Sequence, residues 1–305
     1  PSSRTEVGVA AQPARVGIVI RTLDRPYFLE RALRDVLAQS FADWEIVIAN
    51  DGGDGAAVRR LVAGLRSGLA GRTSVIDVEG PNGRCAAANQ GLRATRAPYV
   101  ILHDDDDLWD PDFLSATVDW LDDHPGDAGV MVPTEIVYER ERRGRYVETG
   151  RVPFWAGLSQ ITYLDLLSVN RAVPISFLYR RALHDEVGYY DETLEAVEDW
   201  EFYLRVTVDH HIGFLRGRPL AFWTQRPHAR GVTANSMYAL GDLHVRDETR
   251  VRDRAIRAFV RQYGSGMPHL VAGMVQAQLR EQERLRYRRS LRGLLGRVRG
   301  RLAGR

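Results

Sequence analysis

The sequence predicts an α/β protein built on a doubly wound, mostly parallel sheet. Between residues 16 and 110, four short apolar runs of strand length alternate with segments of helical periodicity, and each run leads into a polar loop. Strands that alternate with helices form parallel sheets with right-handed crossovers. The four loops are therefore expected at the carboxyl edge of the sheet, where open α/β folds bind their ligands.

The first half of the chain follows this pattern closely. Residues 1–15 are polar and are expected to be a disordered lead-in. Pro26 suits the first turn of a helix. The expected strands are 16–20, 45–49, 74–78 and 99–102, and the expected helices are 26–39, 55–69, 85–95 and 112–123.

The second half loses the regular alternation, which indicates a mixed or antiparallel arrangement. Its expected strands are 130–138, 146–152, 175–179, 213–215 and 220–224, and its expected helices are 161–169, 180–187 and 195–208. From Met237 the pattern is helical to the end.

Composition excludes several kinds of chemistry. The chain is 44% apolar and 27% charged, as in ordinary globular proteins, and it contains one cysteine, Cys85. It therefore lacks the residues for a disulfide framework or a cysteine-rich zinc site. It has no lysine, which excludes Schiff-base chemistry and a P-loop lysine. It shows neither a membrane-spanning run nor a signal peptide, so we expect a cytoplasmic protein, and we expect no nucleic-acid partner.

The fourth strand ends in His103 and four consecutive aspartates, Asp104 to Asp107. Adjacent carboxylates repel one another unless a cation or strong hydrogen-bond donors lie among them. A divalent cation is the simplest remedy, and oxygen ligands suit Mg²⁺ or Mn²⁺. The alternative is a solvated acidic loop that caps the helix beginning near Pro111, which explains Asp110 better than the run of four.

A glycine-rich loop also follows the second strand, where Gly53 and Gly55 suggest a dinucleotide-binding site with Asp77 as the ribose acid. The third glycine of that motif is replaced by Val58, and the loop does not follow the first strand. This interpretation is the weaker one.

Five segments in order resemble the family 2 inverting glycosyltransferases. They are Thr22-Leu23-Asp24-Arg25-Pro26-Tyr27-Phe28-Leu29 with the helix after it and Gln39-Ser40-Phe41, Trp44 to Gly52 with its Asn-Asp-Gly ending, Asn82-Gly83-Arg84 to Asn89-Gln90-Gly91, Asp104 to Trp109, and Glu198-Asp199-Trp200 to Leu204-Arg205. The resemblance implies a GT-A fold, with a nucleotide-binding half joined to a mixed acceptor half, over residues 16–232. Residues 233–305 are then a helical extension with a basic tail.

The resemblance also implies roles on the donor side. Thr22, Arg25 and Asp51 would contact the base and phosphates of a nucleotide diphosphate sugar, most simply a UDP-sugar. Asn82 and Arg84, at a helix start, would bind phosphate. By position alone, Asp51 also suits a turn and Asn82 a helix cap.

The Asp-x-Asp element of the family aligns best as Asp104-x-Asp106. Asp106 would then be a ligand of Mn²⁺ or Mg²⁺, and Asp104 would lie near the ribose and the metal. Asp105 with Asp107 is the other register, which keeps Asp105 among the donor-binding candidates. A histidine is common near the end of the family's domain, so His228 is a further candidate metal ligand.

The resemblance assigns the catalytic base to Asp199. Glu198 and Asp199 stand at a helix start, which by itself also explains two acidic residues. One base with in-line displacement inverts the anomeric carbon. Gln225-Arg226-Pro227-His228-Ala229 lacks the Gln-x-x-Arg-Trp signature of processive members, so transfer of a single sugar is expected.

The acceptor is expected to be a hydroxyl of a glycan, a lipid-linked glycan or a small natural product. Residues 276–305 hold ten arginines and two glutamates, with apolar residues on one helical face, a pattern of helices that lie on anionic membranes. Peripheral contact with the inner membrane face is one interpretation, and a frayed, solvated tail is the other. A non-catalytic nucleotide-sugar-binding scaffold of the same fold, and a sugar nucleotidyltransferase, are the competing functions.

Overall fold

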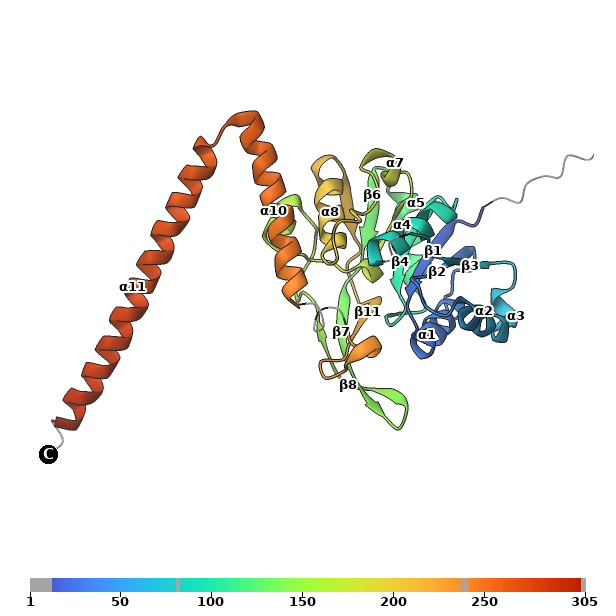
Figure 1. Cartoon of the computed structure of the whole chain (residues 1–305), viewed down its shortest axis with the longest axis horizontal. Coiled ribbons are helices and arrows are strands. Elements are labelled where there is room, and N and C mark those ends of the chain that lie inside the picture. Colours follow the sequence, from blue (N-terminus) through green and yellow to red (C-terminus); the bar gives the residue numbers. More distant parts are fainter. Residues whose placement is uncertain (1–12, 81–82, 236, 238–240, 303–305) are drawn as a thin grey trace, which may run out of the picture. The chain divides into compact units, whose positions relative to one another are not determined.

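The computed structural model describes residues 13–80, 83–235, 237 and 241–302, and Figure 1 shows its course. The chain divides after Asp247 into two compact units. The first contains both β-sheets, and the second is helical. Most of the lead-in expected at residues 1–15 lies outside the described residues.

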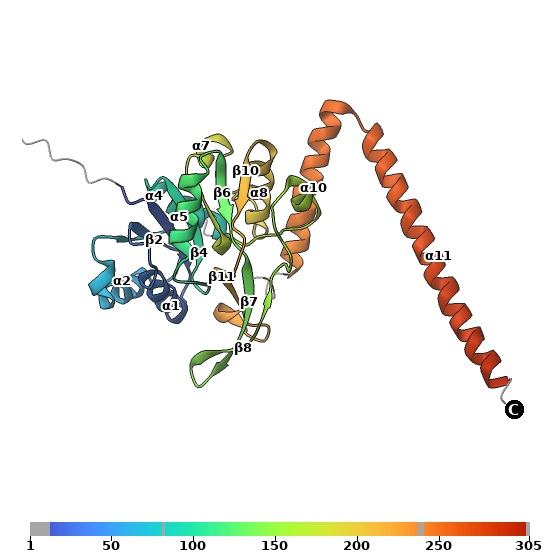
Figure 2. The same ribbon diagram turned by 180° about the vertical axis from the view of Figure 1, so that it is seen from behind.

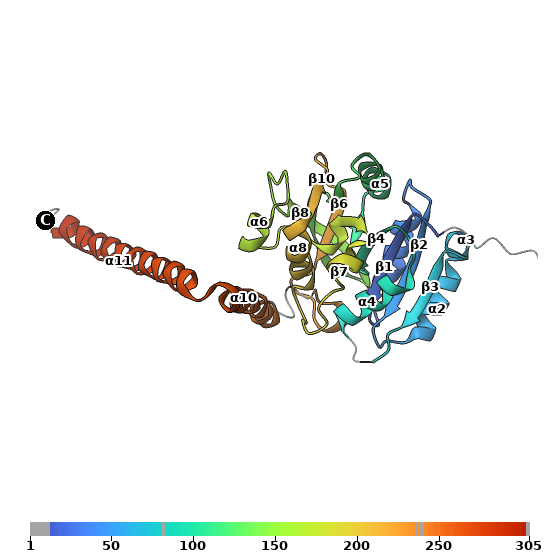
Figure 3. The same ribbon diagram turned by 90° about the horizontal axis from the view of Figure 1, so that it is seen from above.

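The larger sheet has seven strands in the order β10-β6-β9-β4-β1-β2-β3. The first half of the chain supplies β1 (Val16–Thr22), β2 (Trp44–Asn50), β3 (Thr73–Asp77) and β4 (Tyr99–Asp104), all mutually parallel. The second half adds β6 (Asp127–Met131), β9 (Phe177–Arg180) and β10 (His211–Phe214). Because β9 is antiparallel to both β4 and β6, the second half is mixed. Figure 3 shows β2 and β3 toward one side of the sheet and β6 and β10 toward the other. The predicted α/β fold is confirmed.

Helices cover both faces of this sheet. Their bounds are α1 (Pro26–Leu37), α2 (Gly55–Gly64), α3 (Arg66–Leu69), α4 (Arg84–Ala94), α5 (Phe113–Asp123), α6 (Tyr163–Ser168), α7 (Leu183–Glu186) and α8 (Glu198–Asp209). On one face, alternate residues of β1 such as Ile18 pack with Leu29 and Leu33 of α1 in the main core. On the other, Gly91 of α4 lies so close to Val19 that an added Cβ would be 2.3 Å from Val19 Cγ1.

A second sheet of four strands has the order β5-β11-β7-β8, with β5 (Leu108–Trp109), β11 (Ala221–Gln225), β7 (Thr134–Arg142) and β8 (Arg145–Pro153). The hairpin of β7 and β8 extends away from the larger sheet (Figures 1 and 2). The single strand expected at 130–138 is wrong, because β6 ends at Met131 and β7 begins at Thr134 in another sheet. Pro133, between them, has no N–H to continue a strand ladder. The two-residue strand β5 was not predicted.

The C-terminal part is helical, as expected. Helix α10 (Gly241–Tyr263) and helix α11 (Gly266–Leu302) are separated at Gly264, whose φ of +80° a glycine adopts readily. Two short 3₁₀ turns, η1 (Pro174–Ser176) and η2 (Gly231–Thr233), precede β9 and α10. Within the described residues, the helices are all too short or too polar to span a lipid bilayer.

Candidate functional site

The ends of β1 and β4 create the centre of the site. The two strands are parallel neighbours, and their register places Arg21 opposite Asp104. Arg21 donates to Asp104 Oδ1 from Nε at 3.0 Å and from Nη2 at 2.5 Å, and its Nη1 donates to Glu198 Oε1 at 2.9 Å. The Arg21 side chain is 6% exposed. One buried guanidinium therefore joins the aspartate run to the start of α8.

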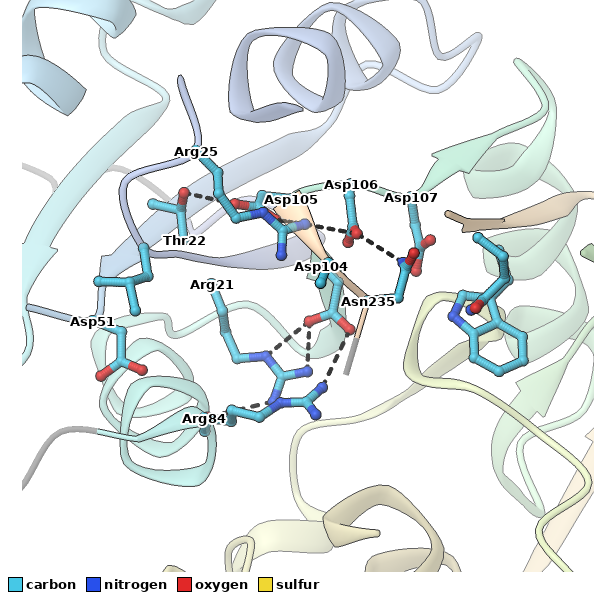
Figure 4. Close-up of a pocket in the computed structure, with 14 residues that line it drawn as sticks. Arg21, Thr22, Arg25, Asp51, Arg84, Asp104, Asp105, Asp106, Asp107 and Asn235 are labelled. Atoms are coloured by element: carbon cyan, nitrogen blue, oxygen red, sulfur yellow. Dashed lines mark hydrogen bonds and ion pairs between the residues drawn. The ribbon is translucent and has the colours of Figure 1, made fainter. Parts of the chain in front are cut away.

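The remaining aspartates are held by donors from distant parts of the chain (Figure 4). Asp105 accepts from the Thr22 hydroxyl at 2.7 Å and pairs with Arg25 at 2.9 Å. Asp106 Oδ2 pairs with Arg25 at 2.6 Å, accepts from the Asn235 amide at 3.1 Å, and pairs with Arg226. Two hydrogen-bond donors and the Arg25 guanidinium thus converge on one carboxylate oxygen.

Asp107 is held differently, because its Oδ1 accepts from the backbone N–H of Thr224 at 2.8 Å. Burial, together with the charges of Asp106 and Asp104, holds the pKa of Asp107 well above its usual range. Asp107 thus ties the aspartate run to β11.

Asp104 and Asp105 differ in charge at neutral pH. Burial acts to raise the pKa of Asp104, but the guanidiniums of Arg21 and Arg84 outweigh it and lower this pKa to about 2. For Asp105, burial raises the pKa to about 7 despite the opposing charge of Arg25. Asp104 is thus the firmly ionised member. The arginines that pair with the run relieve part of the repulsion expected within it.

A pocket of about 270 Å³ opens over this cluster. The residues that line it are Arg21, Thr22, Leu23, Arg25, Asp51, Arg84, Asp104, Asp105, Asp106, Asp107, Trp223, Gln225, Ala234 and Asn235. Seven predicted site residues are among them: Thr22, Arg25, Asp51, Arg84, Asp104, Asp105 and Asp106. The structure therefore brings the loops of β1, β2 and β4 together, as their places at strand ends predict.

Two of the predicted site residues meet at the start of α4, one from the loop after β2 and one from the helix itself. Asp51 Oδ1 accepts from the backbone N–H of Gly83 at 2.8 Å, which fixes the Asn-Asp-Gly loop against this helix. Arg84, the first residue of α4, reaches Asp104 Oδ2 at 3.8 Å and Glu198 Oε1 at 3.5 Å, and its side chain is 30% exposed. Asn82 lies outside the described residues.

Asp199 occupies the first turn of α8, directly after the left-handed Val197. It is half-buried, and its Oδ2 accepts from the Asn170 amide at 2.9 Å. Burial, followed by the adjacent charge of Glu198, raises the pKa of Asp199 to about 6. Asp199 does not line the 270 Å³ pocket itself. Glu198, bonded to Arg21, connects it to that pocket.

The structure does not bring His228 to the pocket, because this side chain is exposed and lies outside the residues that line it. The structure also adds Arg21, Arg226 and Asn235, which the sequence did not single out. Arg21 carried only a weak signal, since it directly follows the expected strand 16–20, whereas β1 continues to Thr22. Arg226 and Asn235 carried none, because 120 and 129 residues separate them from Asp106.

The aspartates are compatible with one divalent cation that also binds substrate oxygens. Within the described residues, no group of three or more His, Cys, Asp and Glu side chains could hold a metal ion alone. Mg²⁺ needs only one or two carboxylates when phosphates and water complete its shell. Asp106 Oδ2 is occupied by nitrogen donors, whereas Oδ1 makes no hydrogen bond to the described residues. That oxygen fits a metal ligand.

Comparisons with known proteins agree on one family. The model of glycosyl transferase family 2 matches residues 17–188. The uncharacterized glycosyltransferase YwdF of Bacillus subtilis is 31% identical over 202 residues, which are 65% of this chain and 70% of YwdF. A PGL/p-HBAD biosynthesis glycosyltransferase of Mycobacterium bovis is 25% identical over 62% of this chain and 68% of its own length.

Solved structures share the fold. TarS residues 1–349 of S. aureus, in complex with UDP-GlcNAc, superposes with a TM-score of 0.57 at 19% identity, over 72% of this chain and 61% of that one. The mannosyltransferase PcManGT of Pyrobaculum calidifontis, in complex with GDP-Man and Mn²⁺, gives a TM-score of 0.50 at 20% identity, over 73% and 59%. The chain thus spans about three fifths of these structures. With its family match and its fold, this chain belongs to glycosyl transferase family 2.

Proposed function

We propose that the protein is a metal-dependent, inverting glycosyltransferase that transfers one sugar from a nucleotide diphosphate sugar to a hydroxyl acceptor. The observation that carries this proposal is the bridge made by Arg21. Its guanidinium binds Asp104 in the pocket and Glu198 beside Asp199. A donor site and a basic carboxylate are thus held next to each other by one buried side chain.

For the donor, we assign Thr22, Arg25 and Asp51 to the nucleoside and phosphates, and Asn82 and Arg84 to the diphosphate. Thr22, Arg25, Asp51 and Arg84 line one pocket. Arginine suits this task, because its fork of N–H donors matches phosphate oxygens. A UDP-sugar is favoured, since TarS binds UDP-GlcNAc in a related fold. PcManGT binds GDP-Man, so the nucleotide base must be determined by experiment.

Asp106 and Asp104 would hold Mn²⁺ or Mg²⁺. When bound, the cation supplies positive charge that stabilises the departing nucleoside diphosphate. PcManGT was solved with Mn²⁺, which supports this assignment. We favour the Asp104-x-Asp106 register, because Asp107 is bonded to the backbone of Thr224, whereas Asp106 Oδ1 makes no hydrogen bond to the described residues. His228 does not enter this proposal.

For the chemistry, we assign the base to Asp199. It takes the proton of the acceptor hydroxyl as the acceptor oxygen bonds to the anomeric carbon, and the bond from that carbon to phosphate breaks with its electron pair leaving on the diphosphate. A single in-line displacement inverts the configuration. A pKa of about 6 leaves Asp199 ionised yet basic at neutral pH. Glu198 remains ionised through Arg21 and Arg84.

The acceptor we propose is a hydroxyl of a glycan, a lipid-linked glycan or a small natural product. We further propose a cytoplasmic protein that contacts the inner membrane face through residues 276–305. Ten arginines against two glutamates support this contact. Exposed apolar side chains in the preceding turns of α11, among them Leu270 and Met274, add to it.

The donor site is tested by thermal unfolding with UDP, GDP and dTDP, each with and without Mn²⁺. A ligand at 100 times its dissociation constant stabilises the fold by about 2.7 kcal/mol, which ranks the three bases. Asp106→Asn should remove the metal-dependent part of the shift. Asp112→Asn, at an exposed aspartate close by in sequence, should keep it. Equal shifts with and without Mn²⁺ would exclude the metal.

The base is tested by Asp199→Asn, which should abolish transfer but keep the nucleotide-induced stabilisation. The anomeric configuration of the product, read by NMR, distinguishes inversion from retention. If the variant transfers sugar as fast as wild type, Asp199 is not the base. If wild type binds nucleotide but neither transfers nor hydrolyses any nucleotide sugar, the non-catalytic scaffold is the better interpretation.

A further inference from the structure

Asn170 makes a directed contact with the proposed base. It lies between α6 and η1, on the acceptor half of the chain, and its Nδ2 donates to Asp199 Oδ2 at 2.9 Å. Its own amide is held in turn, because Oδ1 accepts from the backbone N–H of Ala172 at 3.2 Å. Ala172 is 3% exposed, so this anchor lies in the interior.

These two bonds fix which end of the amide faces Asp199. Only a carbonyl oxygen can accept from the Ala172 N–H, so the NH₂ group of Asn170 must point to the carboxylate. A donor at Oδ2 favours the charged form and restricts rotation of the carboxylate. The backbone N–H of Trp200 also donates to the Asp199 carboxylate, and Asn170 adds the side-chain hydrogen bond at Oδ2.

Several other charged or titratable groups surround Asp199. Glu198 is its neighbour on α8 and pairs with Arg84 of α4 and Arg21 of β1. Tyr203 lies one turn further along α8. Asp165 belongs to α6, which packs against α8. Burial and the charge of Glu198 raise the pKa of Asp199, whereas the bond from Asn170 lowers it. Asn170 is therefore a neutral hydrogen-bond donor that lowers the pKa of Asp199, against the effects of burial and of Glu198.

We propose that Asn170 is a positioning residue, which holds the Asp199 carboxylate ionised and restricts its rotation for removal of the acceptor proton. The proposal rests on the role of Asp199 as base. It adds a residue from the acceptor half to the machinery of the reaction. An acidic residue at position 170 would have the reverse effect, because two adjacent carboxylates resist ionisation of both.

The test measures release of nucleoside diphosphate between pH 5 and 9, with water as the acceptor. A panel of UDP- and GDP-hexoses is first screened with wild type. The sugar nucleotide from which nucleoside diphosphate is released fastest is then used for all variants. The variants are Asn170→Ala, Asn170→Asp and, as a control, Val169→Ala. Val169 is the adjacent residue and is 38% exposed. Urea unfolding at pH 8 checks that each variant is folded.

Activity should rise with pH as the base ionises. In Asn170→Ala the midpoint of this rise should move up by about one pH unit, so the rate falls roughly tenfold below pH 6 and returns to within about threefold of wild type at pH 8.5. Asn170→Asp should move the midpoint further. Val169→Ala should keep the wild-type midpoint.

A merely structural role would lower the rate of Asn170→Ala by the same factor at every pH. A folded Asn170→Ala whose midpoint equals that of wild type therefore overturns the role of Asn170 while leaving the transferase function intact. If wild type releases no nucleoside diphosphate from any hexose nucleotide, both the transferase function and the role of Asn170 are overturned.

Discussion

Arg21 shows how single residues resolve the charge problem of the aspartate run. Its side chain is 6% exposed and pairs with Asp104 and with Glu198, which is 3% exposed. Buried ion pairs cost desolvation of every member, so removing one partner leaves the others charged without compensation. The arginine is thus expected to stabilise the fold, and it also links the pocket to the start of α8.

Arg21→Met should lower the free energy of unfolding by about 3 kcal/mol, because Asp104 and Glu198 would lose their closest cation. Urea unfolding at pH 7 measures this loss. The matched control is Arg34→Met, which removes an exposed arginine that pairs with Glu30 within α1 and should cost no more than about 0.5 kcal/mol. Equal losses in the two variants would contradict a special role for the buried arginine.

At the scale of elements, close contact between α4 and β1 sets where Arg84 lies at the pocket. The helix begins at Arg84, and its Gly91 rests directly on Val19. A helix that approaches a sheet this closely needs a residue without a side chain at the contact. The position of the Arg84 guanidinium therefore depends on a glycine two turns away.

Gly91→Ala should destabilise the protein by about 1–3 kcal/mol, because the new methyl group would overlap Val19 in a packed core. Gly64→Ala, in α2, is the matched control. A Cβ there meets no atom within 4 Å, so the substitution should instead raise stability, by up to about 1 kcal/mol. Thermal unfolding of both variants checks the signs, and a stabilising Gly91→Ala would refute the close contact.

At the scale of the whole molecule, the chain combines an α/β unit with a helical unit of different composition. Helix α10 starts within the first unit, where Asp247 is fully buried and accepts from the backbone N–H groups of Glu195 and Ala196. These two residues precede the helix that carries Asp199. The first turns of α10 are therefore anchored, within the first unit, to the segment that precedes α8.

Deletion of residues 276–305 should abolish sedimentation of the protein with anionic vesicles. Basic residues near an anionic membrane contribute about 1 kcal/mol each, and the deleted segment holds ten arginines. Vesicles of zwitterionic lipid serve as the control and should bind neither form. Unchanged sedimentation of the deletion variant with anionic vesicles would rule out this segment as the membrane contact.

The sequence by itself determined the α/β class, the parallel order of the first four strands and the gathering of their loops at one edge. These follow from the local periodicity of apolar residues, which indicates which face of each helix or strand is buried. The same periodicity merged β6 and β7 into one strand, because an apolar run does not say which sheet each residue joins. The helix break at Gly264 was missed for a similar reason, since helical periodicity continues on both sides of it.

The tertiary structure alone decided which charges meet. Arg21 faces Asp104 because β1 and β4 pair in one register, and Asp106 receives Arg226 and Asn235 from a loop more than 100 residues later. The Asn170 contact with Asp199 likewise joins two elements 29 residues apart. Pairing between distant side chains depends on strand register and helix packing, which the whole fold sets at once, so no local pattern in the sequence encodes it.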